Sequence, residues 1–262
     1  MSPSGNVGSL LTKARVGGVV DLSTVDWYGK VTSMIFFAGC NFKCPYCQNA
    51  SLIPAESGKE MDTEDLCKRI EGNADVIDAV GFTGGEPCLQ AEALKDIAKK
   101  ARSIGLEVFL NTNGSSPVAV TRLADEGLLD YVAVDVKAPL RPESYQTVVG
   151  MKHSDWDMTR SIKATLETCL EKKVTVEART TIVPTLMDKE TDVRDIASEI
   201  VGVDLYVLQQ FSPEGDLLDQ SFKNLTPPTK QDLLRLAEAA SEYGLKEIRI
   251  RTREHGEEKV WP

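Results

Sequence analysis

Three of the six cysteines in this 262-residue sequence lie within eight residues, at Cys40, Cys44 and Cys47. Spacings of four and three residues would place the thiols on one helix face, but the ring of Pro45 clashes with helical backbone. A loop around a metal centre is the better interpretation. Structural zinc usually takes four protein ligands, and the sequence has no second Cys-x-x-Cys pair. Iron–sulfur clusters usually take four thiolates, so three would leave one iron open, which is typical of a catalytic centre. Three unrelated loop cysteines are the alternative.

A glycine-rich segment, Thr83-Gly84-Gly85-Glu86-Pro87, follows an apolar run. Adjacent glycines let backbone approach a ligand that any side chain would block, and Glu86 with backbone carbonyls can receive an ammonium group. Taken alone, the segment also reads as a turn before a helix. The segment Asn111-Thr112-Asn113-Gly114 follows the next apolar run and contains an Asn-Gly turn signal, which means little by itself.

Charged residues follow the next two apolar runs. Strand alternation puts Asp135 and Lys137 on one face, opposite the valines of the same run. Two opposite charges inside a fold are costly unless they pair or serve a ligand, and a structural ion pair is the alternative. Glu177 and Arg179 also share a face, where an inward arginine can hold a carboxylate with two hydrogen bonds. An internal Glu177–Arg179 pair is the alternative there. The sixth run ends at Gln209-Gln210.

Short β-branched runs alternate with helical patterns along the chain. The predicted strands are 31–37, 76–82, 106–110, 131–136, 174–182, 205–208 and 245–250. The predicted helices are one that Asp62 or Thr63 caps, then 94–104, 121–127, 159–171, 188–201 and 229–243. Six βα units fit a partial barrel or a doubly wound sheet. Polar residues at the C-terminal ends of strands one to six favour the barrel, whose active sites lie at that end. The predicted fold class is therefore α/β, a partial (β/α)6 TIM-like barrel.

The composition and the net charge disfavour several classes of function. The formal net charge is −10 and basic residues form only short pairs, which disfavours nucleic-acid binding. No apolar run is long enough to span a membrane and no secretory signal precedes the fold, so a cytoplasmic protein is expected. We expect one domain over residues 1–262, with a flexible extension at 1–18 and a barrel core at 31–250. Cys67, Cys88 and Cys169 are expected to be small buried hydrophobes.

The Cys-x-x-x-Cys-x-aromatic-Cys motif, with Tyr46 as the aromatic, resembles the signature of radical S-adenosylmethionine (SAM) enzymes. The segment Thr83–Pro87 resembles the glycine-rich motif of that family. Within it, the chain is similar to glycyl-radical-enzyme activating proteins, and most to those of anaerobic ribonucleoside-triphosphate reductase. This finer resemblance is carried by the segments 26–30, 39–49, 83–87, 112–114, 135–137, 179–184 and 209–211.

The resemblance implies one 4Fe–4S cluster on the three clustered cysteines, with SAM on the open iron. It implies no catalytic residue beyond the cluster ligands. The residues expected to bind the cofactor are Thr83, Gly84, Gly85, Glu86, Asn111, Thr112, Asn113, Asp135, Lys137, Arg179 and Gln210. Some relatives hold a monovalent cation with an aspartate at the position of Asn111, and a neutral amide binds a cation less well.

The implied reaction cleaves SAM reductively and abstracts a hydrogen from a glycine of a partner glycyl radical enzyme, here anaerobic ribonucleotide reductase. A ferredoxin or flavodoxin would supply the electron. The alternatives are a radical SAM enzyme acting on a nucleoside, peptide or small molecule, and a non-catalytic iron–sulfur carrier or sensor. The latter would use four protein ligands, and the missing fourth cysteine speaks against it.

Overall fold

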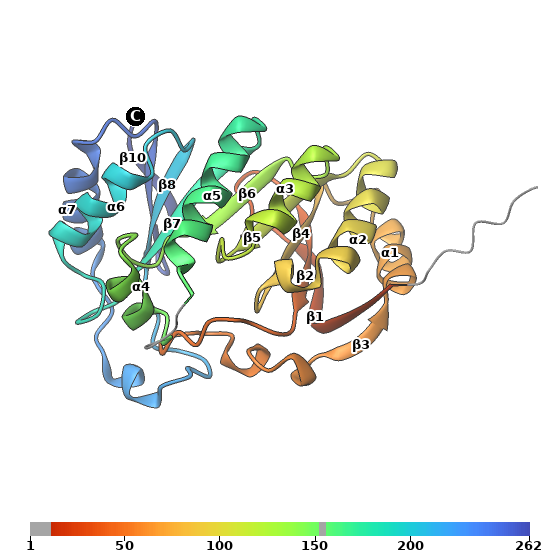
Figure 1. The fold of residues 1–262 in the computed structure, drawn as a ribbon, viewed down its shortest axis with the longest axis horizontal. Helices are drawn as coiled ribbons and strands as arrows, with labels where there is room; N and C mark the ends of the chain where they lie inside the picture. The colour runs from red at the N-terminus through yellow and green to blue at the C-terminus, as the bar shows by residue number, and fades with distance from the viewer. Residues whose placement is uncertain (1–11, 152–155) are drawn as a thin grey trace, which may run out of the picture.

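The structure, a computed structural model, describes residues 12–151 and 156–262 (Figure 1). Its strands are β1 (Lys13–Ser23), β2 (Thr32–Phe37), β3 (Lys59–Asp62), β4 (Ala79–Gly84), β5 (Glu107–Thr112), β6 (Tyr131–Asp135), β7 (Thr175–Ile182), β8 (Leu205–Gln210), β9 (Ile248–Thr252) and β10 (Gly256–Trp261). Its α-helices are α1 (Thr63–Gly72), α2 (Ala91–Ser103), α3 (Pro117–Asp125), α4 (Pro142–Val148), α5 (Met158–Glu171), α6 (Glu190–Glu199) and α7 (Lys230–Ser241). Short 3-10 helices lie at Ala50–Leu52, Ala55–Ser57, Pro87–Gln90 and Gln220–Asn224.

The strands form one sheet in the order β10-β9-β8-β7-β6-β5-β4-β2-β1-β3. Neighbours from β2 to β9 pair in parallel, while β1, β3 and β10 add antiparallel edges. A helix follows each of the first six parallel strands, which confirms the six βα units. The helices lie along one face of the sheet, whereas a doubly wound sheet has them on both (Figure 1). Within the described residues β3 and β10 do not pair with each other, so the barrel is partial.

Strand alternation separates two apolar regions. Val132 and Val134 of β6 belong to the large core between sheet and helices, whereas Ala133 lies on the inner face with Met34 and Phe109. This arrangement confirms the faces expected from the period of two in a strand. The residues that follow on the inner face of β6 therefore point into the barrel.

The loop between β1 and β2 closes the N-terminal end of the barrel. The ring of Trp27 lies 5.6 Å from that of Phe109 and 5.0 Å from that of Tyr131. The guanidinium of Arg249, on β9, lies 5.1 Å from the ring centre of Tyr28. Aromatic packing at this end leaves the opposite, C-terminal end for a site.

The structure extends the expected elements at both ends of the chain. Residues 13–18, expected in a flexible extension, belong to β1, which pairs with β2 and β3. Residues 1–11 lie outside the described residues, so that part of the expectation is not addressed. Neither the strand β10 nor the helix α4 was predicted, because their sequences are mostly polar.

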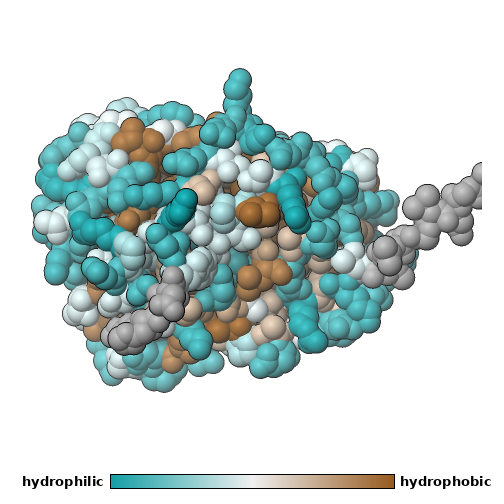
Figure 2. All heavy atoms as spheres, in the orientation of Figure 1, coloured by the Kyte–Doolittle hydropathy of each residue, from teal (hydrophilic) through white to brown (hydrophobic). Residues whose placement is uncertain are grey.

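Side-chain burial follows the expected pattern with one exception. Cys88 and Cys169 are buried as small hydrophobes, and Cys67 is only partly buried. Asp62 occupies the N-cap position of α1, but its side chain makes no cap hydrogen bond. Thr229 caps α7 in a reciprocal arrangement with Asp232. Hydrophilic side chains cover most of the face in Figure 2. No helix in residues 12–151 and 156–262 is long and apolar enough to cross a bilayer.

Candidate active site

A cavity of about 560 Å³ lies at the C-terminal ends of the parallel strands. This size is within the usual range for small-molecule and cofactor sites. The expected site residues that line it are Cys40, Cys44, Cys47, Thr83, Gly84, Gly85, Asn111, Thr112, Asn113, Asp135, Lys137, Arg179 and Gln210. Glu86 is the one expected residue that does not line it.

The loop that carries the three cysteines, residues 38–49, is fixed by backbone hydrogen bonds to distant segments. Cys40 N donates to Ile53 O at 3.0 Å, and Lys43 N donates to Val149 O at 3.0 Å. On another side, Asp219 N donates to Pro45 O at 2.9 Å. The segments after β2 and β8 thus run along the same side of the molecule (Figure 1). The loop is held in place by the protein itself.

The glycine-rich segment docks directly onto this cysteine loop. Gly85 N donates to Phe37 O at 2.8 Å, and Glu86 N donates to Gly39 O at 2.7 Å. A Cβ on Gly85 would lie 2.2 Å from Gly39 O, and a Cβ on Gly84 would lie 2.4 Å from Phe37 O. The two glycines are therefore required where two backbones meet, in addition to any role beside a ligand.

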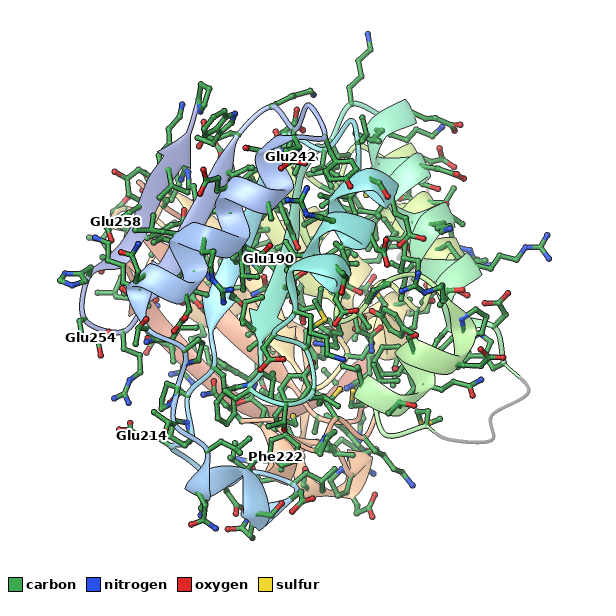
Figure 3. All side chains as sticks on the ribbon, turned by 90° about the vertical axis from the view of Figure 1, so that its left-hand side faces the viewer. Glu190, Glu214, Phe222, Glu242, Glu254 and Glu258 are labelled. Atoms are coloured by element: carbon green, nitrogen blue, oxygen red, sulfur yellow. The ribbon has the colours of Figure 1, made fainter. Side chains whose placement is uncertain are left out.

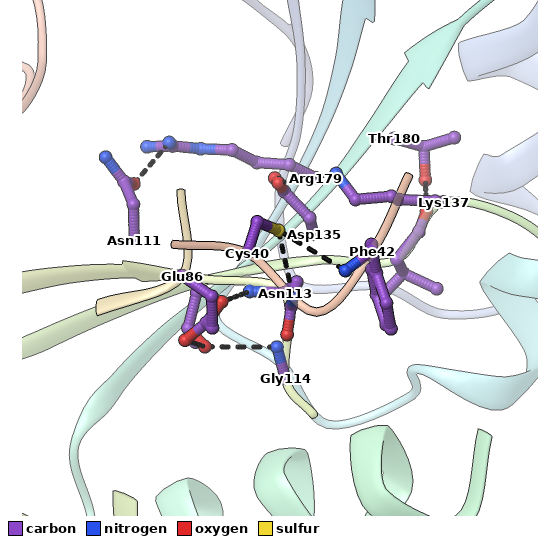
Figure 4. Close-up of polar contacts among 12 residues, drawn as sticks. Cys40, Phe42, Glu86, Asn111, Asn113, Gly114, Asp135, Lys137, Arg179 and Thr180 are labelled. Atoms are coloured by element: carbon purple, nitrogen blue, oxygen red, sulfur yellow. Dashed lines mark hydrogen bonds and ion pairs between the residues drawn. The ribbon is translucent and has the colours of Figure 1, made fainter. Parts of the chain in front are cut away.

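Glu86 lies beneath the cavity and ties two strand ends together. It is fully buried, and its carboxylate accepts from Asn113 N at 2.7 Å (Figure 4). It also accepts from Thr112 Oγ1 at 2.7 Å and from Cys88 N at 3.0 Å. Burial raises its pKa, and these hydrogen bonds oppose that rise. With three donors bound inside the protein, the structure gives Glu86 a supporting position rather than the expected contact with an ammonium group.

Asp135 and Lys137 lie side by side at the end of β6, where alternation placed them. Lys137 Nζ lies 2.8 Å from Asp135 Oδ2, and both residues line the cavity. Tyr145 Oη bridges their backbones, accepting from Lys137 N and donating to Asp135 O, both at 3.1 Å. Burial is the largest single effect and alone would lower the pKa of Lys137, but Asp135, Tyr46 and Cys44 together outweigh burial and raise the pKa well above its usual value. The lysine stays cationic beside the cysteine loop.

Arg179 of β7 reaches across the inner face of the barrel. Its Nε is paired with Glu177, and its Nη1 donates to Asn111 Oδ1 at 2.6 Å (Figure 4). Its Nη2 is buried and has no hydrogen-bond partner among the described residues. Both readings of this arginine thus hold in part: it forms the internal ion pair, and one donor remains for a ligand. A buried unpaired donor is costly, so it marks a place where a ligand acceptor would be stabilised.

Comparison with known proteins agrees with this arrangement. Residues 34–200 match the sequence profile of the Radical SAM superfamily. The chain belongs to the radical SAM superfamily. It is 39% identical over 240 residues to a Methanocaldococcus jannaschii protein provisionally named a glycyl-radical enzyme activating enzyme, covering 92% of this chain and 97% of that protein.

Two further comparisons extend the likeness. This radical SAM protein is 26% identical over 250 residues to the pyruvate formate-lyase 1-activating enzyme of Escherichia coli K12, covering 88% of this chain and 97% of that enzyme. A radical SAM methyltransferase from Sphaerobacter thermophilus has the same fold, with a TM-score of 0.69 at 15% identity, over 86% of this chain and 67% of that one. The structural likeness concerns the fold alone.

Radical SAM enzymes use a 4Fe–4S cluster and SAM, and the cavity fits both groups. Three cysteines line one cavity that has room for a cofactor, and Arg179, whose buried Nη2 has no partner among the described residues, is also a lining residue. Within residues 12–151 and 156–262, no three His, Cys, Asp or Glu side chains are grouped to hold a single metal ion. A four-iron cube is larger than one ion and its thiolates stand further apart, so this spacing does not oppose a cluster.

The thiols are protonated before a metal binds. Burial raises the pKa of Cys40 to about 11 and that of Cys44 to about 12, and it also raises the pKa of Cys47. The nearby ammonium of Lys137 lowers all three pKa values, but less than burial raises them. Because thiolates are the ligating form, cluster binding must release these protons.

The far wall of the cavity combines Gln210, which was expected to bind the cofactor, with residues that were not expected there. Both Gln209 and Gln210 line it, and the Gln210 amide is already bound to Pro228 O at 2.8 Å. Arg251 and Arg253, from β9 and the turn after it, complete this wall. The predicted strand ended at residue 250, before both arginines, because the apolar run ends there. The alternation of Ile248 and Ile250 with arginines is the sequence pattern that could have indicated a longer strand with inward-facing arginines.

Proposed function

We propose that this chain activates a glycyl radical enzyme. The observation that carries the proposal is the 39% identity to the M. jannaschii activating-enzyme relative over nearly the full length of both chains. The E. coli relative, an activating enzyme for pyruvate formate-lyase, adds support at lower identity. The open cavity at the barrel end provides the kind of site that such a reaction needs.

In this proposal Cys40, Cys44 and Cys47 ligate the cluster, and SAM occupies the rest of the cavity. When bound, the two groups supply a one-electron reductive cleavage of SAM that yields an adenosyl radical able to abstract hydrogen. The backbones of Gly84 and Gly85 lie at the cavity surface, where carbonyl oxygens can accept from an ammonium group. Because the Glu86 carboxylate below them is already hydrogen-bonded to three donors, the backbone carbonyls of these glycines are the groups proposed to bind the ammonium.

The cationic residues bind the carboxylate end of the cofactor. Arg179 offers its free Nη2 donor, and Lys137 keeps a positive charge near the cysteine loop. Asn111 and Glu177 fix the guanidinium, so little side-chain freedom is lost when a carboxylate binds. Thr83, Thr112, Asn113, Asp135 and Gln210 form the remaining wall in this proposal.

The partner is proposed to be anaerobic ribonucleotide reductase, with a ferredoxin or flavodoxin as electron donor. The sequence resemblance supports the reductase, and the relatives named above do not include a protein described as acting on one. We further propose that residues 1–262 form a single radical SAM domain that works in the cytoplasm.

The test is an anaerobic mixture of the reconstituted, reduced protein, SAM and the anaerobic ribonucleotide reductase of the same genome. A glycyl doublet in the electron paramagnetic resonance spectrum that disappears when the target glycine is mutated is the expected result. If 5′-deoxyadenosine accumulates without a doublet, the partner assignment fails and another substrate class is favoured.

The cysteine assignment has its own control. Cys44→Ala should abolish SAM cleavage, while Cys67→Ala should leave it intact, because Cys67 lies partly buried in α1, away from the cavity lining. Full activity in Cys44→Ala would overturn the cluster assignment.

A further inference from the structure

Two N–H donors approach the sulfur of Cys40, and one of them comes from a distant strand end. Phe42 N donates to Cys40 Sγ at 3.4 Å, from within the cysteine loop. Asn113 Nδ2 lies 4.0 Å from the same sulfur, on the residue that follows β5 (Figure 4). This second distance is long, so the contact acts mainly through the dipole of the N–H group. The fold, rather than the loop sequence, brings this donor to a proposed cluster ligand.

The orientation of the Asn113 amide is decided by its other contacts. Its Oδ1 accepts from Ser115 N at 2.9 Å, and a backbone N–H group can only donate. The other end of the amide is therefore the NH2 group, which has two donors and faces the cysteine loop. One donor binds Asn41 Oδ1 at 2.9 Å, which leaves the other for Cys40 Sγ.

Asn113 has little freedom to leave this position. Its backbone N donates to the buried Glu86 carboxylate at 2.7 Å, and the residue is only 5% exposed. Asn41 Nδ2 donates to Ser115 Oγ at 2.9 Å, which closes a ring of hydrogen bonds around the amide. A donor that is already fixed can stabilise a new charge without a cost of reorganisation.

A donor aimed at a ligand sulfur affects how easily an iron–sulfur cluster accepts an electron. Reduction adds one negative charge, and the ligand sulfurs carry part of it. Hydrogen bonds to the sulfurs are among the factors that set the reduction potential of a cluster. The positive end of an N–H dipole stabilises the more negative, reduced form, so it makes reduction easier.

We propose that Asn113 is a positioning residue that raises the reduction potential of the cluster through the N–H group it directs at Cys40 Sγ. This inference rests on the proposed function, since it takes Cys40 as a cluster ligand. Both ends of the amide contact protein, so the effect does not depend on SAM. The electron comes from an external one-electron reductant, which is oxidised as the cluster is reduced, and no bond forms or breaks.

The test measures the reduction potential with SAM absent. Asn113→Leu keeps a side chain of similar size and removes the donor. The reconstituted full chain is titrated anaerobically with titanium(III) citrate and redox mediators, and the reduced cluster is counted by electron paramagnetic resonance. At the wild-type midpoint the ratio of reduced to oxidised cluster should fall by about threefold to tenfold, and tenfold corresponds to about 59 mV for one electron.

A second variant guards against misfolding of the first. In Asn113→Ser the hydroxyl can still accept from Ser115 N, as serine does in turns, but it is too short to replace the NH2 group. Its potential should shift in the same direction. Ser115→Ala is the matched control, because it removes a hydroxyl from the same buried ring and keeps the backbone N–H that fixes Asn113. It should leave the potential unchanged.

The outcomes separate this inference from the proposed function. An unchanged potential in both Asn113 variants, or an equal fall in Ser115→Ala, would overturn the role of Asn113 and leave glycyl radical formation untouched. Absence of a glycyl doublet with the wild-type protein would count against the proposed function alone, because the potential is measured without SAM and without a partner enzyme.

Discussion

Glu86 offers a sharp test of how the site is built, because its position differs from the role expected from the motif. The substitution Glu86→Gln keeps the shape of the side chain and replaces one carboxylate oxygen by an NH2 group. Two backbone groups that can only donate bind different oxygens of this carboxylate, Asn113 N and Cys88 N, and Thr112 Oγ1 donates to it as well. At least one donor must then face another donor inside the protein.

The magnitude follows from these contacts. Losing a hydrogen bond to a charged group costs about 1.5–3 kcal/mol, and a buried donor left unpaired costs about 1–3 kcal/mol. Removing the charge offsets part of this cost, because burial of the carboxylate is unfavourable and raises its pKa. We therefore expect the free energy of unfolding of the apo protein to fall by about 2 kcal/mol.

Anaerobic urea unfolding of the apo protein measures this change as a shift of the midpoint at constant slope. Glu254→Gln is the control, since Glu254 is exposed near the turn between β9 and β10 (Figure 3) and makes no hydrogen bond or ion pair within the described part of the chain. It should change stability by less than about 0.5 kcal/mol. If Glu86→Gln also stays within that range but weakens SAM binding, Glu86 contacts the cofactor and the supporting position is wrong.

Three further predictions concern other parts of the barrel. Gly85→Ala should destabilise the protein by about 1–3 kcal/mol and lower the iron content after reconstitution, because its Cβ would lie 2.2 Å from Gly39 O. Gly72→Ala, with nothing within 4 Å of its Cβ, should do neither, as unfolding and iron assays would show. The pKa of Glu257 is lowered, because Arg251 and Arg249 outweigh the effect of its burial. Its carboxylate therefore stabilises the fold at pH values above its ordinary pKa of 4.5, and this stabilisation is lost as the pH falls through the lower pKa of the folded state. Glu257→Gln should therefore lower stability at pH 7 and flatten its acid dependence in thermal unfolding; an unchanged acid limb contradicts this. Replacing K⁺ by tetramethylammonium should leave SAM affinity unchanged, because Arg179 already occupies Asn111 Oδ1, and a clear K⁺ requirement would show a cation site.

The sequence was sufficient for the parts of the site that depend on local periodicity. A strand turns alternate side chains to opposite faces, so the inward positions of Asp135 and Arg179 could be predicted from β6 and β7 alone. The three cysteines were placed in a loop by Pro45, and the structure has a loop there. Neither inference requires knowledge of distant contacts.

What could not be predicted depends on partners far away in the chain. The position of Glu86 is decided by donors at residues 112 and 113, and a glutamate that ties two strands has the same sequence signal as one that binds a ligand. The strand β10 is mostly polar, and it pairs with β9 partly through the ion pair between Arg251 and Glu257. Such a strand has no apolar run to reveal it.

The charges inside the barrel explain why the site can form before any cofactor binds. A cation enclosed by protein is costly unless an anion lies beside it, and each inward cation here has one: Lys137 with Asp135, and Arg179 with Glu177. These pairs hold the cations in the cavity wall without using every donor. Arg179 Nη2 is the donor that remains without a partner among the described residues. A ligand carboxylate bound to it would add a hydrogen bond without separating an existing ion pair, so this contact should contribute most to the binding free energy. Substituting Glu177 would release the guanidinium from its position, whereas substituting Arg179 would remove the donor itself, so the two changes should affect SAM binding through different steps.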